Sequence, residues 1–215
     1  MKKNNKGFSL IEIVVVLAIM GVIAAFLTPM LFNYMSDSKL RRAQNDVSQI
    51  AGVIGSFNTD AGVYPVYSAL PCSRTNATAV VLVTSGINAE SSDSAWNDGN
   101  TAGGSAWTDN ATGSLLKTHF EDGKVSGGAS FYNDSTNGLK NPNKWKGPYM
   151  SDFKADPWGN KYYVSAEGLW PGSSKAAFVL SAGPNATIET SLSQIIGTNT
   201  PSISVGGDDI AFRIK

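Results

Sequence analysis

The sequence has few of the side chains from which most active sites are built. Its only cysteine, Cys72, can form neither an intramolecular disulfide nor, by itself, a cysteine-based zinc site. Its only histidine, His119, lies outside any His-Glu-x-x-His motif. The 215 residues contain no Walker-type phosphate-binding loop and no Gly-x-Ser-x-Gly element. These absences argue against nucleotide hydrolysis and serine-hydrolase chemistry.

The chain also lacks a net charge, because 17 lysines and arginines balance 17 aspartates and glutamates. A global basic surface that would indicate nucleic-acid binding is therefore missing. The balance is uneven, however, since Lys2, Lys3 and Lys6 precede Phe8 and no acid does. Removal of that leader would leave a mildly acidic chain.

A long apolar segment follows these lysines. Residues 13–32 contain no charged side chain and are numerous enough to cross a bilayer as a helix. The pattern is also that of a secretory signal peptide, but no small-x-small cleavage site follows the apolar run. We therefore expect a membrane anchor that stays on the chain, with the lysines on the cytoplasmic side and the rest of the chain outside.

The helix is expected to continue beyond the apolar run, from about Ser9 to Asn58. Apolar residues recur there at spacings of three and four, which predicts one buried helix stripe: Leu40, Ala43, Val47, Ile50, Ile54 and Phe57. Gly21 and Pro29 are either points of weakness, with a helix break at Pro29, or ordinary residues of a membrane helix.

Glu12 lies at the edge of the apolar run. A carboxylate in hydrocarbon costs on the order of several kcal/mol unless a partner neutralises it. Glu12 is thus either an interfacial carboxylate that reaches water or an acid with a specific partner.

The remainder of the chain predicts a small antiparallel sheet that packs on the helix stripe. The candidate strands are 161–166, 176–181 and 209–214; 78–83 is either a strand or a short helix, and 114–120 is a candidate helix. Between them lies a polar region that contains Trp96 and Trp107. The segment Asp156-Pro157-Trp158-Gly159-Asn160 predicts a tight turn in which Asp156 accepts backbone N–H bonds and Trp158 covers the core.

The segment Lys6-Gly7-Phe8-Ser9-Leu10-Ile11-Glu12, followed by the apolar run and Pro29, resembles the class III signal of type IV pilins and type II secretion pseudopilins. The resemblance implies cleavage between Gly7 and Phe8 by an inner-membrane prepilin peptidase and N-methylation of Phe8. It also implies that the apolar helix stays on the mature subunit, and this suggests a partner for Glu12. We hypothesise that the new α-amine of Phe8 on one subunit meets Glu12 of its neighbour and sets the stagger of the assembly.

Four further segments are similar to the major pseudopilin of type II secretion. They are Trp145–Tyr149, Asp156–Tyr162, Phe178–Gly183 and Gly206–Ile210. The resemblance implies an α+β type IV pilin fold, in which a long N-terminal helix packs on a small antiparallel sheet. The expected divisions are a leader (1–7), a helix (8–58, with 8–32 in the membrane or filament core and 33–58 amphipathic), a variable polar region (59–143) and a sheet domain (144–215). The region 70–143 is longer than the family pattern.

The same resemblance implies calcium in the loop before the last strand, where several oxygen ligands would be needed. Asn185 stands where the family has an aspartate, while Asp209 matches a second family aspartate and Asp208 adds a carboxylate. These three residues are the expected metal site.

The leading hypothesis is a structural subunit of a periplasmic pseudopilus in type II protein secretion, and not an enzyme. The expected partners are further copies of the chain, the prepilin peptidase, the inner-membrane assembly platform and minor pseudopilins, without nucleic acid. An alternative is a type IV pilin of an extracellular pilus for adhesion, motility or DNA uptake. A third hypothesis is a membrane-tethered enzyme or carbohydrate binder that uses Trp96, Trp107 and His119.

Overall fold

The computed structural model describes most of the helix and the C-terminal part of the chain. The described residues are 7–67, 81–87, 89–91, 115–124, 132, 145–192, 194–195 and 202–215. The three leader lysines, Cys72, Trp96 and Trp107 lie outside the described residues, so the structure does not bear on the predictions made for them.

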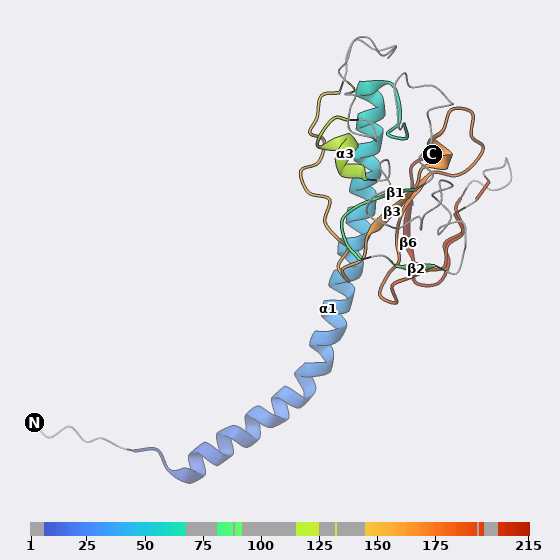
Figure 1. Cartoon of the computed structure of the whole chain (residues 1–215). Coiled ribbons are helices and arrows are strands. Elements are labelled where there is room, and N and C mark those ends of the chain that lie inside the picture. Colours follow the sequence, from blue (N-terminus) through green and yellow to red (C-terminus); the bar gives the residue numbers. More distant parts are fainter. Residues whose placement is uncertain are drawn as a thin grey trace, which may run out of the picture. The chain divides into compact units, whose positions relative to one another are not determined.

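Helix α1 is the longest element and spans Leu10–Ala61, 52 residues (Figure 1). The chain divides into two compact units within this helix: the first ends at Arg41 and the second begins at Arg42. The helix ends where the amide of Gly62 donates to the Asn58 carbonyl oxygen at 2.9 Å. This end lies within the predicted stop signal at residues 58–62.

The predicted helix break at Pro29 is wrong for the isolated chain, because α1 continues through this residue. A proline removes a single backbone hydrogen bond, and the flanking residues keep theirs. In addition, the Thr28 hydroxyl donates to the Ala24 carbonyl oxygen at 2.7 Å, which adds a side-chain bond one residue before the proline.

The first unit exposes its apolar side chains. Ile13, Leu17 and Phe26 are 48%, 62% and 77% exposed, and the other large apolar residues of this segment are similarly uncovered. The helix is long and apolar enough to cross a membrane. Hydrophobic surface of this extent requires lipid or other protein to cover it.

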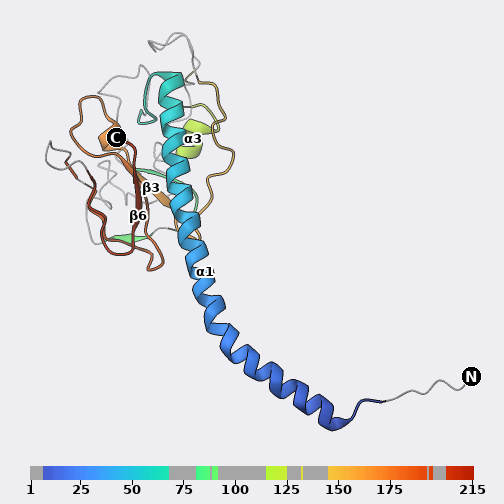
Figure 2. The ribbon, with the colours of Figure 1, turned by 180° about the vertical axis from the view of Figure 1, so that it is seen from behind.

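The second unit contains a four-stranded antiparallel sheet in the order β1-β3-β4-β6 (Figures 1 and 2). The strands are β1 (Val81–Val83), β3 (Tyr162–Ser165), β4 (Phe178–Ser181) and β6 (Ile210–Arg213). The last three lie within predicted strands, and β1 resolves the segment 78–83 as a strand and not a helix over the residues described. The register places Leu82 opposite Val164, Val164 opposite Val179, and Val179 opposite Phe212.

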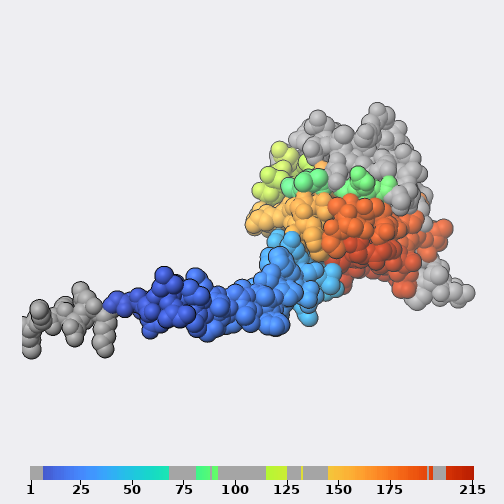
Figure 3. Space-filling model, turned by 90° about the horizontal axis from the view of Figure 1, so that it is seen from below, coloured from blue at the N-terminus to red at the C-terminus, as the bar shows by residue number. Residues whose placement is uncertain are grey.

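Short elements complete this unit. Strands β2 (Glu90–Ser91) and β5 (Thr187–Ile188) form a separate parallel pair, helix α3 spans Leu116–Phe120, and a 3₁₀ turn, η2, spans Glu167–Leu169. The C-terminal segments, coloured orange to red, are exposed on the face of this unit that Figure 3 shows.

The core of the second unit lies between the helix stripe and the sheet. Ala43, Val47, Ile50, Ile54 and Phe57 are buried, and their cluster includes Leu82, Tyr162, Val164, Val179 and Ile210 from the sheet. Leu40, the first member of the predicted stripe, is 39% exposed and belongs to the first unit. The structure thus confirms the predicted α+β class, a long N-terminal helix packed on a small antiparallel sheet, and the arrangement is consistent with the type IV pilin fold.

Phe57 is the aromatic centre of this core. Its ring makes edge contacts with Phe120, Tyr132 and Tyr149, at centroid distances of 5.2, 5.0 and 5.6 Å. These contacts fix segments that are far apart in the sequence onto the C-terminal end of helix α1.

Candidate functional sites at the helix N-terminus and the β5–β6 loop

The N-terminus of helix α1 carries a polar partner for Glu12. The Ser9 amide donates to Glu12 Oε2 at 2.8 Å, while the amides of Glu12 and Ile13 donate to the Ser9 carbonyl oxygen at 3.1 and 3.3 Å. Ser-x-x-Glu is the sequence of a capping box, in which the glutamate binds the amide of the residue that precedes the helix. A carboxylate is also favoured at this end by the helix dipole. This intrachain role of Glu12 was not among the predictions, although Ser-x-x-Glu is present in the sequence.

The predicted processing site precedes the helix. Gly7 and Phe8 are non-helical, and Phe8 is 86% exposed. The bond between them therefore lies in accessible, irregular backbone. Phe8, Ile11, Glu12, Val15 and Val16 line an open groove along the first turns of the helix, and it is almost wholly apolar.

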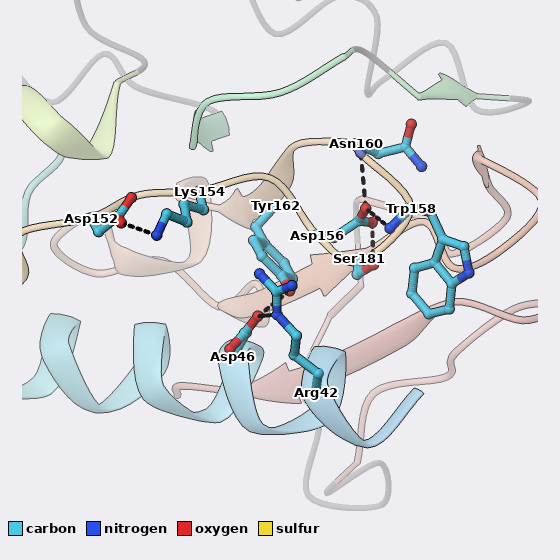
Figure 4. Close-up of polar contacts among 9 residues, drawn as sticks. All are labelled: Arg42, Asp46, Asp152, Lys154, Asp156, Trp158, Asn160, Tyr162 and Ser181. Atoms are coloured by element: carbon cyan, nitrogen blue, oxygen red, sulfur yellow. Dashed lines mark hydrogen bonds and ion pairs between the residues drawn. The ribbon is translucent and has the colours of Figure 1, made fainter. Parts of the chain in front are cut away.

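The tight turn predicted at Asp156 is confirmed (Figure 4). Asp156 Oδ1 accepts the amides of Trp158 and Asn160 at 2.9 and 2.8 Å, and Oδ2 accepts the Ser181 hydroxyl at 2.7 Å. Gly159 adopts a φ of 98°, which a side chain would disfavour. Trp158 packs against the main core cluster, as predicted. Asp156 is 4% exposed and all of these contacts are structural.

A partly buried polar contact joins helix and sheet. The Tyr162 hydroxyl donates to Asp46 Oδ2 at 2.8 Å, and Arg42 Nε lies 3.5 Å from the same oxygen (Figure 4). Burial raises the pKa of Tyr162 well above its usual value. The Asp46 carboxylate, which accepts a hydrogen bond from the hydroxyl, raises this pKa further.

The three residues of the predicted metal site lie together around the β5–β6 loop. The Asn185 amide donates to Asp208 Oδ2 at 3.1 Å, and Asn185 Oδ1 accepts the Thr187 amide at 2.7 Å. Asn185 therefore forms a local turn and contacts one of the two predicted acidic ligands.

Asp209 is the most buried of these three residues, at 8% exposure. Its Oδ2 accepts the amides of Glu189 and Thr190 at 2.9 and 2.7 Å, so its carboxylate faces the segment after β5. Burial raises the pKa of Asp209 above its usual value despite these bonds, and the nearby negative charge of Glu189 contributes to the same direction.

Among the residues that the structure describes, two side-chain oxygens at this loop are buried without a hydrogen-bond partner: Asp208 Oδ1 and Asp209 Oδ1. Buried polar atoms are rarely left unpaired, and each such atom calls for an explanation. Carboxylate oxygens of this kind fit the ligand preference of a hard cation such as Ca²⁺. Within the described residues, no three acidic, histidine or cysteine side chains surround one point, so backbone carbonyls and a moved side chain would have to complete a coordination shell.

His119 lies in the core rather than in a surface site. It is fully buried, and its Nδ1 lies 2.6 Å from the Tyr132 hydroxyl. Trp145 Nε1 donates to the His119 carbonyl oxygen at 3.0 Å. These contacts give His119 a packing role in the described part of the chain.

Two family models match separate parts of the chain. Residues 2–28 match the prokaryotic N-terminal methylation motif, and residues 130–197 match type II secretion system protein G. The first match contains Gly7, Phe8 and Glu12, and the second contains the Asp156 turn and Asn185. The predicted resemblance to the type IV pilin and pseudopilin superfamily is confirmed.

Curated relatives carry the same two kinds of name. The fimbrial protein EcpC of Eikenella corrodens is 35% identical over 69 residues, 32% of this chain and 45% of the relative. The type II secretion system core protein G of Pseudomonas aeruginosa is 33% identical over 64 residues, 30% of this chain and 45% of the relative. The type IV major fimbrial protein FimA of Dichelobacter nodosus is 39% identical over 54 residues, 25% of this chain and 35% of the relative.

The chain thus spans less than half the length of these curated relatives. No solved structure matches the chain.

Proposed function

We propose that the chain is a structural subunit of a helical pseudopilus in type II protein secretion, and that it polymerises through helix α1. The observation that carries this proposal is the match to secretion protein G over the C-terminal part together with the methylation motif at the N-terminus. Growth of the filament, driven by a separate ATPase, would push secreted proteins outward. The role is structural and requires no catalytic residue.

The proposed maturation begins at the leader. A prepilin peptidase cleaves between Gly7 and Phe8, and Phe8 is then N-methylated. The exposed, non-helical backbone at these two residues supports access by an enzyme. Before assembly, the subunit would span the inner membrane once, with the C-terminal domain in the periplasm. The assembly platform and the minor pseudopilins are its further proposed partners.

The proposed assembly contact joins the Phe8 amine of one subunit to Glu12 of its neighbour. The Ser9–Glu12 bond is compatible with this contact, because an ionised carboxylate can accept several hydrogen bonds. The exposed apolar side chains of the first unit would be covered by neighbouring copies of the helix.

Secretion assays and imaging test this proposal together. The gene for the chain is deleted from its host, and the amount of secreted protein is measured. In a second strain the chain is overproduced, and the filaments that form are imaged. We expect secretion to fail on deletion and to return with the intact gene, and we expect short periplasmic filaments that contain the chain. Normal secretion in the deletion strain would contradict the proposal.

A type IV pilin is the second candidate function. The fimbrial relatives, which reach identities comparable with those of the secretion relatives, favour it. It predicts long surface fibres made mostly of this chain under native expression, together with unimpaired protein secretion after deletion.

We also propose that calcium binds between Asn185, which precedes β5, and Asp208 and Asp209, which precede β6. The two unpartnered carboxylate oxygens support this site. Bound calcium would supply positive charge there and tie the loop to the start of β6.

Calorimetry and thermal melting of the full-length chain in detergent test the proposed calcium site. Calcium added after chelation should bind and raise the melting temperature, whereas magnesium should do so weakly. An unchanged melting temperature and no heat of binding would show that the chain does not bind calcium.

A further inference from the structure

We infer that Glu189 is an additional ligand of this calcium site and supplies the negative charge that Asn185 lacks. The inference rests on the calcium proposal above, but it concerns a residue that the sequence comparison with the pilin pattern did not indicate. Glu189 follows strand β5 directly and is exposed at the surface.

The backbone around Gly207 places Glu189 beside the two aspartates. A Cβ atom at Gly207 would overlap the Glu189 carboxylate, and one at Gly206 would lie 2.5 Å from the Glu189 carbonyl oxygen. Two consecutive glycines therefore allow Glu189 to lie against the chain immediately before Asp208 and Asp209. Any larger residue at Gly207 would push this carboxylate away.

Hydrogen bonds link Glu189 to each of the three predicted ligands directly or through one residue. The Glu189 amide donates to Asp209 Oδ2 at 2.9 Å, and Asn185 Nδ2 donates to Glu189 Oε2 at 3.4 Å. The backbone amide of Asn185 in turn donates to Asp208 Oδ2 at 3.1 Å. Asn185 thus lies between the carboxylates of Glu189 and Asp208, and its long bond to Glu189 is weak enough to exchange for a cation.

Three acidic side chains, Glu189, Asp208 and Asp209, lie close together in sequence or in contact at this loop. None of the ion pairs between described residues involves Glu189, Asp208 or Asp209. Asp209 is more than nine-tenths buried; its Oδ2 accepts the Glu189 backbone amide, and its Oδ1 has no hydrogen-bond partner among the described residues. This unpartnered oxygen is the observation that distinguishes the loop from an ordinary cluster of surface acids.

Binding would require a small rearrangement. Because three acidic side chains do not surround one point in the described structure, Glu189 would turn from the Asn185 amide group onto the ion. Its side chain is exposed and long enough to do so. Calcium tolerates irregular shells of six to eight oxygens, so the two aspartates, Glu189 and nearby carbonyls form a suitable set.

The test compares three variants of the full-length chain in detergent with the parent chain by titration calorimetry. E189Q should lower the calcium affinity at least about tenfold, since loss of even an outer-shell partner of a metal ligand has this effect. E90Q is the matched control: it removes one charge from the exposed Glu90 on the neighbouring strand β2, and it should bind calcium as the parent does. N185D should bind more tightly, because it adds a carboxylate to the shell.

The outcomes separate the two proposals. If the parent chain binds no calcium, the proposed calcium site itself fails. If the parent binds calcium and E189Q binds it as tightly as E90Q does, the inference about Glu189 is overturned and the site stands without it. Melting in chelator should show that E189Q folds like the parent, because the replaced side chain is exposed.

Discussion

The Tyr162 hydroxyl donates a hydrogen bond of 2.8 Å to Asp46 and thereby joins strand β3 to helix α1 across 116 residues of sequence. Tyr162 is 2% exposed, so this bond lies at the edge of the core cluster between helix and sheet. Apolar packing permits small shifts along a helix, whereas a directed bond to one carboxylate permits a single alignment. The contact therefore fixes where the sheet lies along the helix within the second unit.

Replacement of Tyr162 by phenylalanine should destabilise the chain. Y162F removes the hydroxyl. Asp46 is partly exposed, so its carboxylate can bind water in place of the hydroxyl, and it keeps its ion pair with Arg42. We therefore expect a loss of about 1 kcal/mol, the usual net value of a hydrogen bond. Denaturant unfolding of the full-length chain in detergent measures it. Y34F is the matched control, since Tyr34 is 74% exposed, and equal stabilities of the two variants would contradict the role of the bond.

Alkaline pH should destabilise the fold through two buried tyrosines. Burial raises the pKa of Tyr163 to about 12, although the Ala89 amide that donates to its hydroxyl opposes the shift, and burial raises that of Tyr162 as well. An unfolded tyrosine ionises near pH 10, at about its model value. Above that pH the native state binds more protons than the unfolded state, so stability falls as the pH rises toward 12.

The expected slope is about 1.4 kcal/mol per pH unit for each tyrosine that stays protonated. Denaturant unfolding between pH 9 and pH 11.5 checks it, with absorbance of the phenolate as the second signal. Y162F should show a shallower decline than the parent chain. A stability that does not change across this range would show that both hydroxyls ionise freely in the native state.

The turn at Asp156 should tolerate asparagine better than alanine. D156A leaves the amides of Trp158 and Asn160 and the Ser181 hydroxyl without their acceptor in a buried site, which should cost about 3 kcal/mol or more. D156N keeps an oxygen for the two amides, and its NH₂ group can donate to Ser181, so a loss of about 1 kcal/mol is expected. Thermal melting ranks the two variants, and equal losses would show that the contacts do not determine the effect.

Two substitutions of Glu12 should separate its intrachain and intersubunit roles. E12Q keeps an acceptor for the Ser9 amide, since glutamine also serves in a capping box, but it removes the charge. E12A removes both. If pairing with the Phe8 amine drives assembly, both variants should insert into the membrane and neither should form filaments. Normal filament yield from E12Q alone would show that the cap, and not the charge, is what assembly requires. Yields are compared by sedimentation and microscopy.

Much of the fold could be predicted because its signals are periodic. The stripe from Ala43 to Phe57 has the spacing of a helix face that packs on a sheet, and β3, β4 and β6 lie in apolar runs bounded by turn residues. Strands β2 and β5 have two residues each, which is too short for any periodic signal. Their parallel pairing depends on the tertiary structure.

The site was less predictable because its contacts are not periodic. Asn185, Asp208 and Asp209 could be proposed from the family pattern, and in the structure the segment before β5 contacts the segment before β6 through the bond from Asn185 to Asp208. Glu189 had no such signal, since its place beside them depends on the absence of side chains at Gly206 and Gly207. The Ser9–Glu12 bond corresponds to the Ser-x-x-Glu motif, a signal that is local and present in the sequence.

Cryo-electron microscopy of assembled filaments tests the central claim, that Glu12 of one subunit pairs with the processed N-terminus of another. We expect density to begin at Phe8 and the amine nitrogen to lie within about 4 Å of a neighbour's Glu12 carboxylate, the range of an ion pair. Filaments whose subunits retain residues 1–7, or in which every Glu12 binds only its own Ser9 and the Phe8 amine is distant from all carboxylates, would contradict the account.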